Sequence, residues 1–219
     1  MIDEIKAVAR RHLAAEGANL SLRAVARDMG MVSSALYRYF ASRDDLLTAL
    51  ILDGYNSLGQ AVETADASVT DRPELRARWL SAAQAVRTWA LSNPAEYALL
   101  YGSPVPGYAA PQDTVVAAAR TPVVLAQILA DGYASGALTE SGCRPSVPLS
   151  DSVRADLARA RDQISAGVPE ELLRIGLTCW VQLFGLVSFE LFGQFNNVID
   201  ARAEFFGEQM ELLADLMGI

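Results

Sequence analysis

The sequence predicts an all-α protein, and three observations lead to that expectation. No stretch of the 219 residues alternates apolar and polar side chains over the length of a strand. Apolar residues recur instead at three- and four-residue spacing, and prolines stand at the breaks between such segments. Hydrophobic residues make up 52% of the chain, which supplies a sizeable core and argues against disorder.

The first 65 residues predict four helices with clear start and stop signals. Ser21 is a good N-cap for the second helix, and Gly30 ends it. Ser42 caps the fourth helix, with Asp45 three residues on, close to a capping box. The predicted ranges of these helices are 2–16, 21–29, 33–40 and 42–65.

Prolines and polar breaks delimit the remaining helices. Asn93–Glu96 combines a cap, a proline and an acid, which is a strong start signal, and Thr121–Pro122 is read as another start. Pro169 opens the most apolar helix. The predicted ranges are 73–92, 94–101, 121–135, 151–166, 169–195 and 200–217, with residues 136–149 irregular.

The third helix has a polar side suited to nucleic acid. Ser33, Ser34, Tyr37 and Arg38 share that side, and short hydroxyls near a helix start approach base edges or phosphates without steric cost. Arg38 fits either a guanine, in a forked contact, or a phosphate. Tyr37 and Tyr39 offer hydroxyl donors to phosphate oxygens.

Charge is distributed unevenly along the chain. Residues 1–45 hold seven Lys or Arg against six Asp or Glu, a net charge of +1, whereas residues 46–219 hold eleven against twenty, a net charge of −9. Arg43 lies in the first turn of its helix, where the dipole disfavours a cation unless a phosphate lies beside it. The asymmetry would turn the acidic part away from DNA, and it predicts few phosphate contacts per subunit.

The run Gly30–Leu47, GMVSSALYRYFASRDDLL, resembles the recognition signature of TetR-family transcriptional repressors. The resemblance implies a helix-turn-helix DNA-binding domain over residues 1–45 and a helical ligand-binding and dimerisation domain over residues 46–219. It also implies a homodimer that represses transcription from a palindromic operator. Val32 stands where the family has a capping Ser or Thr, which leaves open whether Ser33 caps the helix or contacts DNA. By position, the DNA-contacting residues are Ser33, Ser34, Ala35, Tyr37, Arg38, Tyr39 and Arg43.

The segment Trp180–Val187 is similar to the Trp-x-x-x-His-Gly pattern of one C-terminal domain class in the same family, with Phe184 in place of His. The resemblance implies that the last two helices form a dimer bundle. Gly176, Gly185 and Gly193 would permit close approach between helices. The alternative is a core helix packed only within its own chain.

A regulator of this kind needs an effector pocket, and aromatic residues gather between positions 79 and 133. An apolar lining predicts a small lipophilic ligand, with the Gly102–Pro111 loop as a lid. Each aromatic residue alone is more often plain core. The residues predicted to bind the ligand are Trp89, Tyr97, Tyr101 and Trp180.

Other function classes find little support in the sequence. His12 is the only histidine and is read as structural, and no nucleophile, phosphate-loop or dinucleotide motif occurs, so neither an enzyme nor a cofactor or metal is expected. Cys143 and Cys179 are read as reduced thiols of a cytoplasmic protein. The uncharged segment Ile175–Phe189 is shorter than the roughly 20 residues of a membrane span. The remaining alternative is a helical ligand- or partner-binding bundle without sequence-specific DNA binding.

Overall fold

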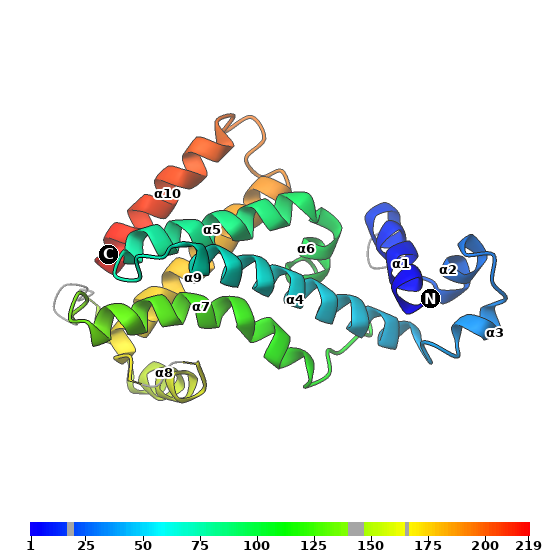
Figure 1. The fold of residues 1–219 in the computed structure, drawn as a ribbon, viewed down its shortest axis with the longest axis horizontal. Helices are drawn as coiled ribbons and strands as arrows, with labels where there is room; N and C mark the ends of the chain where they lie inside the picture. Colours follow the sequence, from blue (N-terminus) through cyan, green and yellow to red (C-terminus); the bar gives the residue numbers. More distant parts are fainter. Residues whose placement is uncertain (17–19, 140–146, 165–166) are drawn as a thin grey trace. The chain divides into compact units, whose positions relative to one another are not determined.

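The computed structural model describes residues 1–16, 20–139, 147–164 and 167–219, and within these ranges all regular secondary structure is helical (Figure 1). The predicted all-α class is therefore confirmed. Cys143 and parts of the predicted irregular segment 136–149 lie outside the described residues. The helices are α1 (Ile2–Glu16), α2 (Leu22–Asp28), α3 (Ser33–Leu36), α4 (Arg43–Ser68), α5 (Leu75–Ser92), α6 (Pro94–Tyr101), α7 (Thr114–Ala134), α8 (Asp151–Ile164), α9 (Glu170–Leu191) and α10 (Arg202–Met217).

The chain forms two compact units. Unit 1 comprises residues 1–58 and 90–118, and unit 2 comprises residues 59–89 and 119–219. The division proposed from the sequence, after residue 45, falls inside the first turn of α4 and remains a prediction about function.

Unit 1 is built around a core to which α1, α2 and α3 all contribute. In this unit α1 packs against α2 and α6, and α2 packs against α3. Val25, Leu36 and Leu47 are fully buried in the shared core. His12 Nε2 lies 2.8 Å from Asp28 Oδ2, which ties α1 to the end of α2 and agrees with a structural role for this histidine.

Unit 2 is a helical bundle in which α9 packs against α8 and α10. A buried charge cluster joins three of its helices. Arg78 of α5 is fully buried; its Nε donates to Asp66 Oδ1 at 2.8 Å and its Nη1 to Asp131 Oδ2 at 2.7 Å. Because two carboxylates face one guanidinium, the charge of Arg78 is compensated inside the bundle.

The largest differences from the predicted helix boundaries are in α3, α7 and α9. Helix α3 ends at Leu36 and does not reach Phe40, because the chain passes into a turn over residues 37–39. Helix α7 begins at Thr114, so Pro122 lies inside it and does not open it. Thr121, read as a cap, is buried together with Leu125 and Ile128 at helical spacing, and this buried stripe carries the helix through the proline. Helix α9 ends at Leu191 and does not reach residue 195, because Gly193 adopts a left-handed φ of 82° that breaks the helix.

Helices α7 and α9 are long and apolar enough to span a membrane by length and composition alone. Core helices of soluble proteins meet the same criterion. In unit 2, α9 buries one side in the bundle and leaves Val181 and Phe189 exposed on the other.

Candidate nucleic-acid interface and ligand cavity

Helix α3 and the turn that follows it, residues 37–39, present a row of exposed polar side chains. Ser34, Tyr37, Arg38 and Tyr39 are exposed, with 45% of Tyr37 and 44% of Tyr39 accessible to solvent. None of these four side chains makes a hydrogen bond or ion pair with another described residue. Their donors are therefore available to an external partner.

The backbone at the start of α3 shows whether Ser33 is the N-cap of the helix. Val32 occupies the N-cap position in an extended conformation and makes no side-chain capping bond, so Ser33 is the first helical residue and not the cap. Ser33 and Ala35 are half-buried. Ser33 precedes Tyr37 by four residues and Ala35 precedes Tyr39 by four, so each adjoins a different side chain of the exposed row.

The other side of α3 fixes the helix to the core. Leu36 is fully buried and Phe40 is 7% exposed. The chain continues in helical turns beyond Leu36, since the backbone N–H groups of Tyr39 and Phe40 both donate to the Leu36 carbonyl, at 2.9 and 3.1 Å. The exposed row is therefore held on a rigid support, as a base-reading surface requires.

A hollow beside α3 brings two arginines next to Tyr37. It is lined by Leu20, Ser21, Leu22, Arg23, Tyr37, Ala41, Ser42 and Arg43. Arg43 Nε donates to the Leu20 carbonyl at 3.1 Å, which fixes the direction of its guanidinium. Arg43 was expected from the sequence to contact phosphate, whereas Arg23 was missed.

The position of both arginines, each in the first turn of a helix, is the sequence signal for a phosphate contact. Arg23 lies in the first turn of α2 and Arg43 in the first turn of α4, where the helix dipole disfavours a cation. A phosphate in the hollow would remove that penalty for both. Ser21 and Ser42 are helix caps, since Ser21 Oγ accepts from Ala24 N at 3.5 Å and Ser42 Oγ from Asp45 N at 3.0 Å.

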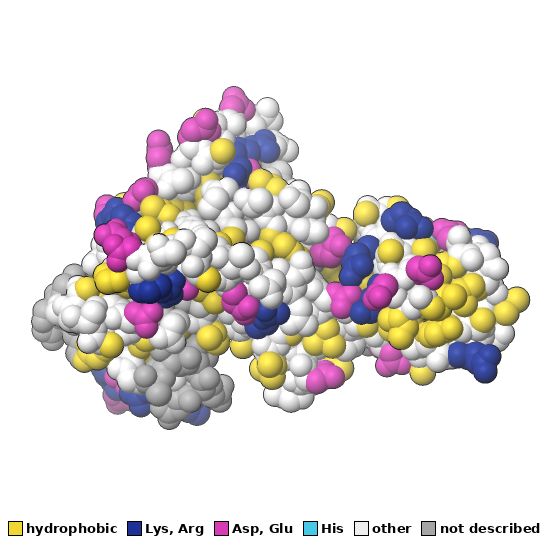
Figure 2. Space-filling model, viewed as in Figure 1, with side chains coloured by type: hydrophobic (Ala, Val, Ile, Leu, Met, Phe, Trp, Pro, Cys, Tyr) yellow, Lys and Arg dark blue, Asp and Glu magenta, His cyan; other side chains and the backbone are white. Residues whose placement is uncertain are grey.

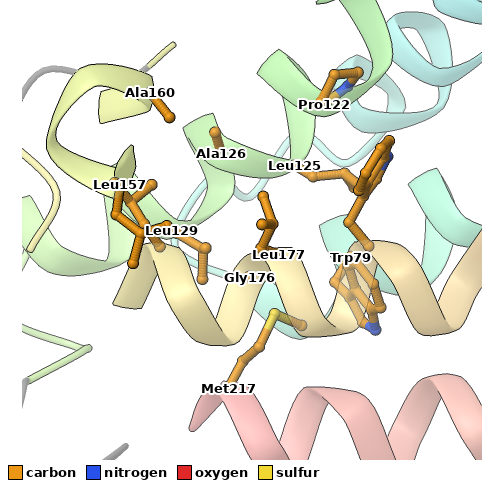
Figure 3. A pocket seen from close by; sticks show the side chains of 12 residues that line it. Trp79, Pro122, Leu125, Ala126, Leu129, Leu157, Ala160, Gly176, Leu177 and Met217 are labelled. Carbon is orange, nitrogen blue, oxygen red and sulfur yellow. The ribbon is translucent and has the colours of Figure 1, made fainter. Parts of the chain in front are cut away.

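Unit 2 contains an apolar cavity with a volume of about 240 Å³. Figure 3 shows labelled side chains from five helices around it, among them Trp79 of α5, Leu125 of α7, Leu157 of α8, Leu177 of α9 and Met217 of α10. The complete lining is Trp79, Pro122, Leu125, Ala126, Leu129, Leu157, Ala160, Leu173, Gly176, Leu177, Trp180 and Met217. No charged side chain belongs to it, so the cavity suits a lipophilic molecule.

Of the four residues predicted to bind a ligand, the cavity lining includes Trp180 but not Trp89, Tyr97 or Tyr101. Tyr97 is fully buried in unit 1 and packs on Tyr101 with ring centroids 5.0 Å apart. Burial, with smaller contributions from Tyr55 and Tyr97, raises the pKa of Tyr101 well above its usual value. Tyr97 and Tyr101 therefore pack on each other in unit 1, apart from this cavity.

The Gly102–Pro111 loop, expected to be a lid, also belongs to unit 1. Tyr108 is half-buried there, and its hydroxyl lies 2.9 Å from Thr48 Oγ1 of α4. Trp79 belongs to the aromatic group expected at a pocket, although it was not among the four predicted contacts. Leu129 and Leu157 were missed as cavity residues, because apolar side chains in a cavity wall follow the same helical pattern as those in a core.

Acidic side chains follow the outer face of α10, as Figure 2 shows along that edge of unit 2. Glu204, Glu208, Glu211 and Asp215 are all exposed. This face would be repelled by a nucleic acid. Among the residues that the structure describes, no three His, Cys, Asp or Glu side chains lie together in a way that would hold a metal ion.

Comparisons with known proteins agree on one family. Residues 5–50 match the family model described as "Bacterial regulatory proteins, tetR family", and residues 79–213 match the model described as "Tetracyclin repressor-like, C-terminal domain". The HTH-type transcriptional regulator Rv1816 of Mycobacterium tuberculosis is 37% identical over 222 aligned residues, covering 98% of this chain and 91% of the relative.

Solved structures give the same result. The regulatory protein SCO4313 superimposes with a TM-score of 0.78 at 35% identity, covering 97% of this chain and 94% of that protein. A bacterial regulatory protein of the tetR family from Rhodococcus RHA1 shares the fold, with a TM-score of 0.66 at 19% identity over 99% of this chain and 96% of that one. These relatives are transcriptional regulators, a class of proteins without enzymatic activity. The chain therefore belongs to the TetR family of transcriptional regulators.

Proposed function

We propose that this regulator is a repressor that binds a palindromic operator as a homodimer and is released by a small lipophilic effector. The observation that carries the proposal is the exposed face of α3 and the turn after it, where Ser34, Tyr37, Arg38 and Tyr39 make no hydrogen bond or ion pair with another described residue. Water solvates these donors in the free protein, and the phosphates and base edges of DNA offer acceptors that can replace this water.

The residues of that face have different roles in DNA binding, because their side chains differ in length and in hydrogen-bonding groups. Arg38 is the one exposed side chain of α3 that can donate two parallel hydrogen bonds, so it reads a base edge in the major groove. Tyr37 stands at the hollow with Arg23 and Arg43, and these three bind a phosphate. Ser34 and Tyr39 flank Arg38 and contact the backbone or a neighbouring base.

Dimerisation through α9 and α10 is supported by the apolar surface that these helices expose. Val181, Gly185 and Phe189 recur every four residues on one side of α9; Val181 is 58% exposed, Phe189 is 52% exposed, and the space over Gly185 is open. Leu212 and Leu216 likewise lie four residues apart on α10 and are exposed, with exposed fractions of 58% and 50%. A second copy would cover these side chains and place two reading helices about 34–36 Å apart, one turn of DNA.

Gly176 has a different role from the one first expected. A Cβ at this position would collide with Leu129 of α7, so this glycine serves packing inside unit 2. Gly185 keeps its expected place on the dimer face. The proposed interface thus uses the middle and the second half of α9.

The cavity of unit 2 is the proposed effector site. Binding there would favour a dimer whose reading helices no longer match one turn of DNA. The regulator acts in the cytoplasm, where its DNA lies.

Fluorescence anisotropy with the DNA that flanks the regulator's own gene tests this proposal. We expect salt-dependent binding at a stoichiometry of two chains per operator, weakened at least tenfold by Tyr37→Ala or Arg38→Ala. Arg154→Ala, which removes an exposed arginine of α8 in unit 2, is the matched control and should bind like the unsubstituted protein. Equal affinity for the flanking DNA and a random duplex would refute sequence-specific repression.

A further inference from the structure

Val32, directly before α3, is an apolar side chain on a polar surface. Its side chain is 71% exposed. Within residues 21–47, all of which the structure describes, it is the only large aliphatic side chain that is exposed. Exposure alone does not require a partner, because soluble proteins commonly leave single apolar residues at the surface. The position of Val32 in the helix gives a second reason to look for one.

Val32 occupies a position where a hydroxyl would stabilise the fold. It is the N-cap of α3 and forms no side-chain capping bond. Helices α2 and α4 on either side of it are capped by Ser21 and Ser42, whose hydroxyl oxygens accept from Ala24 N and Asp45 N. Serine is strongly preferred to valine at an N-cap, because its oxygen satisfies a backbone N–H of the first turn. At Val32 the chain therefore lacks a stabilising bond that both neighbouring helices have.

Ala35 extends the apolar surface of Val32. Residues three apart adjoin on the surface of a helix, and Ala35 follows Val32 by three. Ala35 is half-buried and presents only a methyl group. The two residues thus form a small apolar area beside the exposed polar row that begins with Ser34.

We propose that Val32, together with Ala35, contacts the C5-methyl group of a thymine in each half-site of the operator and so selects thymine there. This assignment rests on the base-reading role of α3 proposed above, and adds a base that the operator contains. The N-terminal residues of a recognition helix approach the base edges, and Val32 lies at that end of α3. The thymine methyl group is the apolar group that base pairs present in the major groove.

The other groups that DNA offers do not suit this side chain. Phosphate oxygens are charged, and Val32 has no donor to replace the water that it would remove from them. Adenine, guanine and cytosine present only nitrogen and oxygen donors and acceptors in the major groove, and a valine would desolvate these groups in the same way. A contact with thymine instead removes two apolar groups from water, which is favourable.

Replacing thymine by deoxyuridine isolates the methyl group, because the two bases carry the same hydrogen-bonding groups and differ only at C5. The operator is first selected from a random-sequence duplex library with the full chain. Each thymine of the selected half-site is then replaced by deoxyuridine in one half-site or in both, and affinities are measured by fluorescence anisotropy at one salt concentration. The protein variants are Val32→Ser, which removes the apolar contact, and Val32→Thr, which keeps one methyl group. Val153→Ser, at an exposed valine of α8 in unit 2, is the matched control.

We expect deoxyuridine at one thymine position to weaken binding of the unsubstituted protein about fourfold per half-site, the effect of one buried methyl group, and about fifteenfold when both half-sites are changed. Val32→Ser should bind the thymine and deoxyuridine duplexes within about twofold of each other. Val32→Thr should retain an intermediate penalty, and Val153→Ser the full one. Serine is a favoured N-cap, so Val32→Ser should fold at least as well as the unsubstituted protein, and the comparison of duplexes with the unsubstituted protein needs no variant.

The remaining outcomes separate this contact from the proposed function. A selected operator without a preferred thymine, or one in which every deoxyuridine duplex binds as the thymine duplex does, would overturn the contact and leave sequence-specific binding intact. An equal deoxyuridine penalty in Val32→Ser and in the unsubstituted protein would assign the methyl group to another side chain. A selection that returns no preferred sequence would overturn both the contact and the proposed function.

Discussion

The buried charge cluster of unit 2 makes a prediction about stability that follows directly from the structure. Arg78 is fully buried between Asp66, which is 14% exposed, and Asp131, which is 40% exposed. In Arg78→Met, the methionine replaces the apolar stem of the side chain, and both carboxylates lose the buried guanidinium, so that Asp66 keeps only Arg72 as a cationic partner. Breaking a buried ion pair costs about 3–5 kcal/mol, and the exposure of Asp131 places the expected loss near the lower end, about 3 kcal/mol.

The pH dependence of that loss has a definite sign. Burial by itself raises the pKa of Asp66, but hydrogen bonds from Arg78 and Arg72 outweigh it, so the pKa lies below its usual value. The intact cluster therefore contributes stability above the pKa of an unfolded aspartate, about 4, and this contribution fades as pH falls through the lower folded value. Without Arg78, only Arg72 offsets the effect of burial, so the pKa of Asp66 rises. Protonation at low pH then removes the unfavourable buried charge of Asp66.

Thermal and urea unfolding at fixed protein concentration measure both effects. The expected 3 kcal/mol corresponds to a lower Tm by about 6–12 °C for a chain of this size. The difference from the unsubstituted protein should persist from pH 7 to about pH 4 and shrink as pH falls further. The triple substitution Arg78→Met, Asp66→Asn, Asp131→Asn should recover part of the loss, and Arg154→Met is the exposed control. A loss below about 1 kcal/mol, or a difference that grows in acid, would refute the reasoning.

Three further predictions concern the functional surfaces. Arg23→Gln and Arg43→Gln should each reduce the slope of log affinity against log salt by about 0.9 per subunit, measured by anisotropy at several salt concentrations; an unchanged slope would exclude a phosphate contact. Val181→Asp should convert a dimer to a 23.5 kDa monomer in analytical ultracentrifugation, whereas the exposed Val153→Asp on α8 should not; a dimer that persists would place the interface elsewhere. Ala160→Leu, which narrows the cavity, should weaken lipophilic ligands at least tenfold with DNA affinity unchanged, and parallel losses of both would indicate general damage to the fold.

The DNA-reading element could be predicted because its pattern is local. Leu36 and Phe40 lie four residues apart, and the residues between and around them are polar, so one helical turn fixes which side is buried. Pro122 shows where a local rule fails. A proline suits the first turn of a helix, but the buried stripe through Thr121 and Leu125 stabilises α7 on both sides of it.

The cavity could not be predicted because its walls come from five helices. Tyr97 and Tyr101 are close in sequence to Trp89, yet the tyrosines belong to unit 1 and the tryptophan to unit 2. Aromatic residues that are close in sequence therefore do not line one pocket in the structure. The partners of Arg78 lie 12 and 53 residues away in sequence, so the charge cluster could not be predicted from the sequence either.

The central claim is that the exposed face of α3 reads bases, and the specificity ratio of one substitution tests it most directly. The ratio compares affinity for the operator with affinity for a random duplex at one salt concentration. The account predicts that Arg38→Ala lowers this ratio at least tenfold, whereas Arg43→Gln weakens both duplexes alike and preserves it. If Arg38→Ala also weakened both duplexes by the same factor, α3 would hold the backbone only and the claim would be wrong.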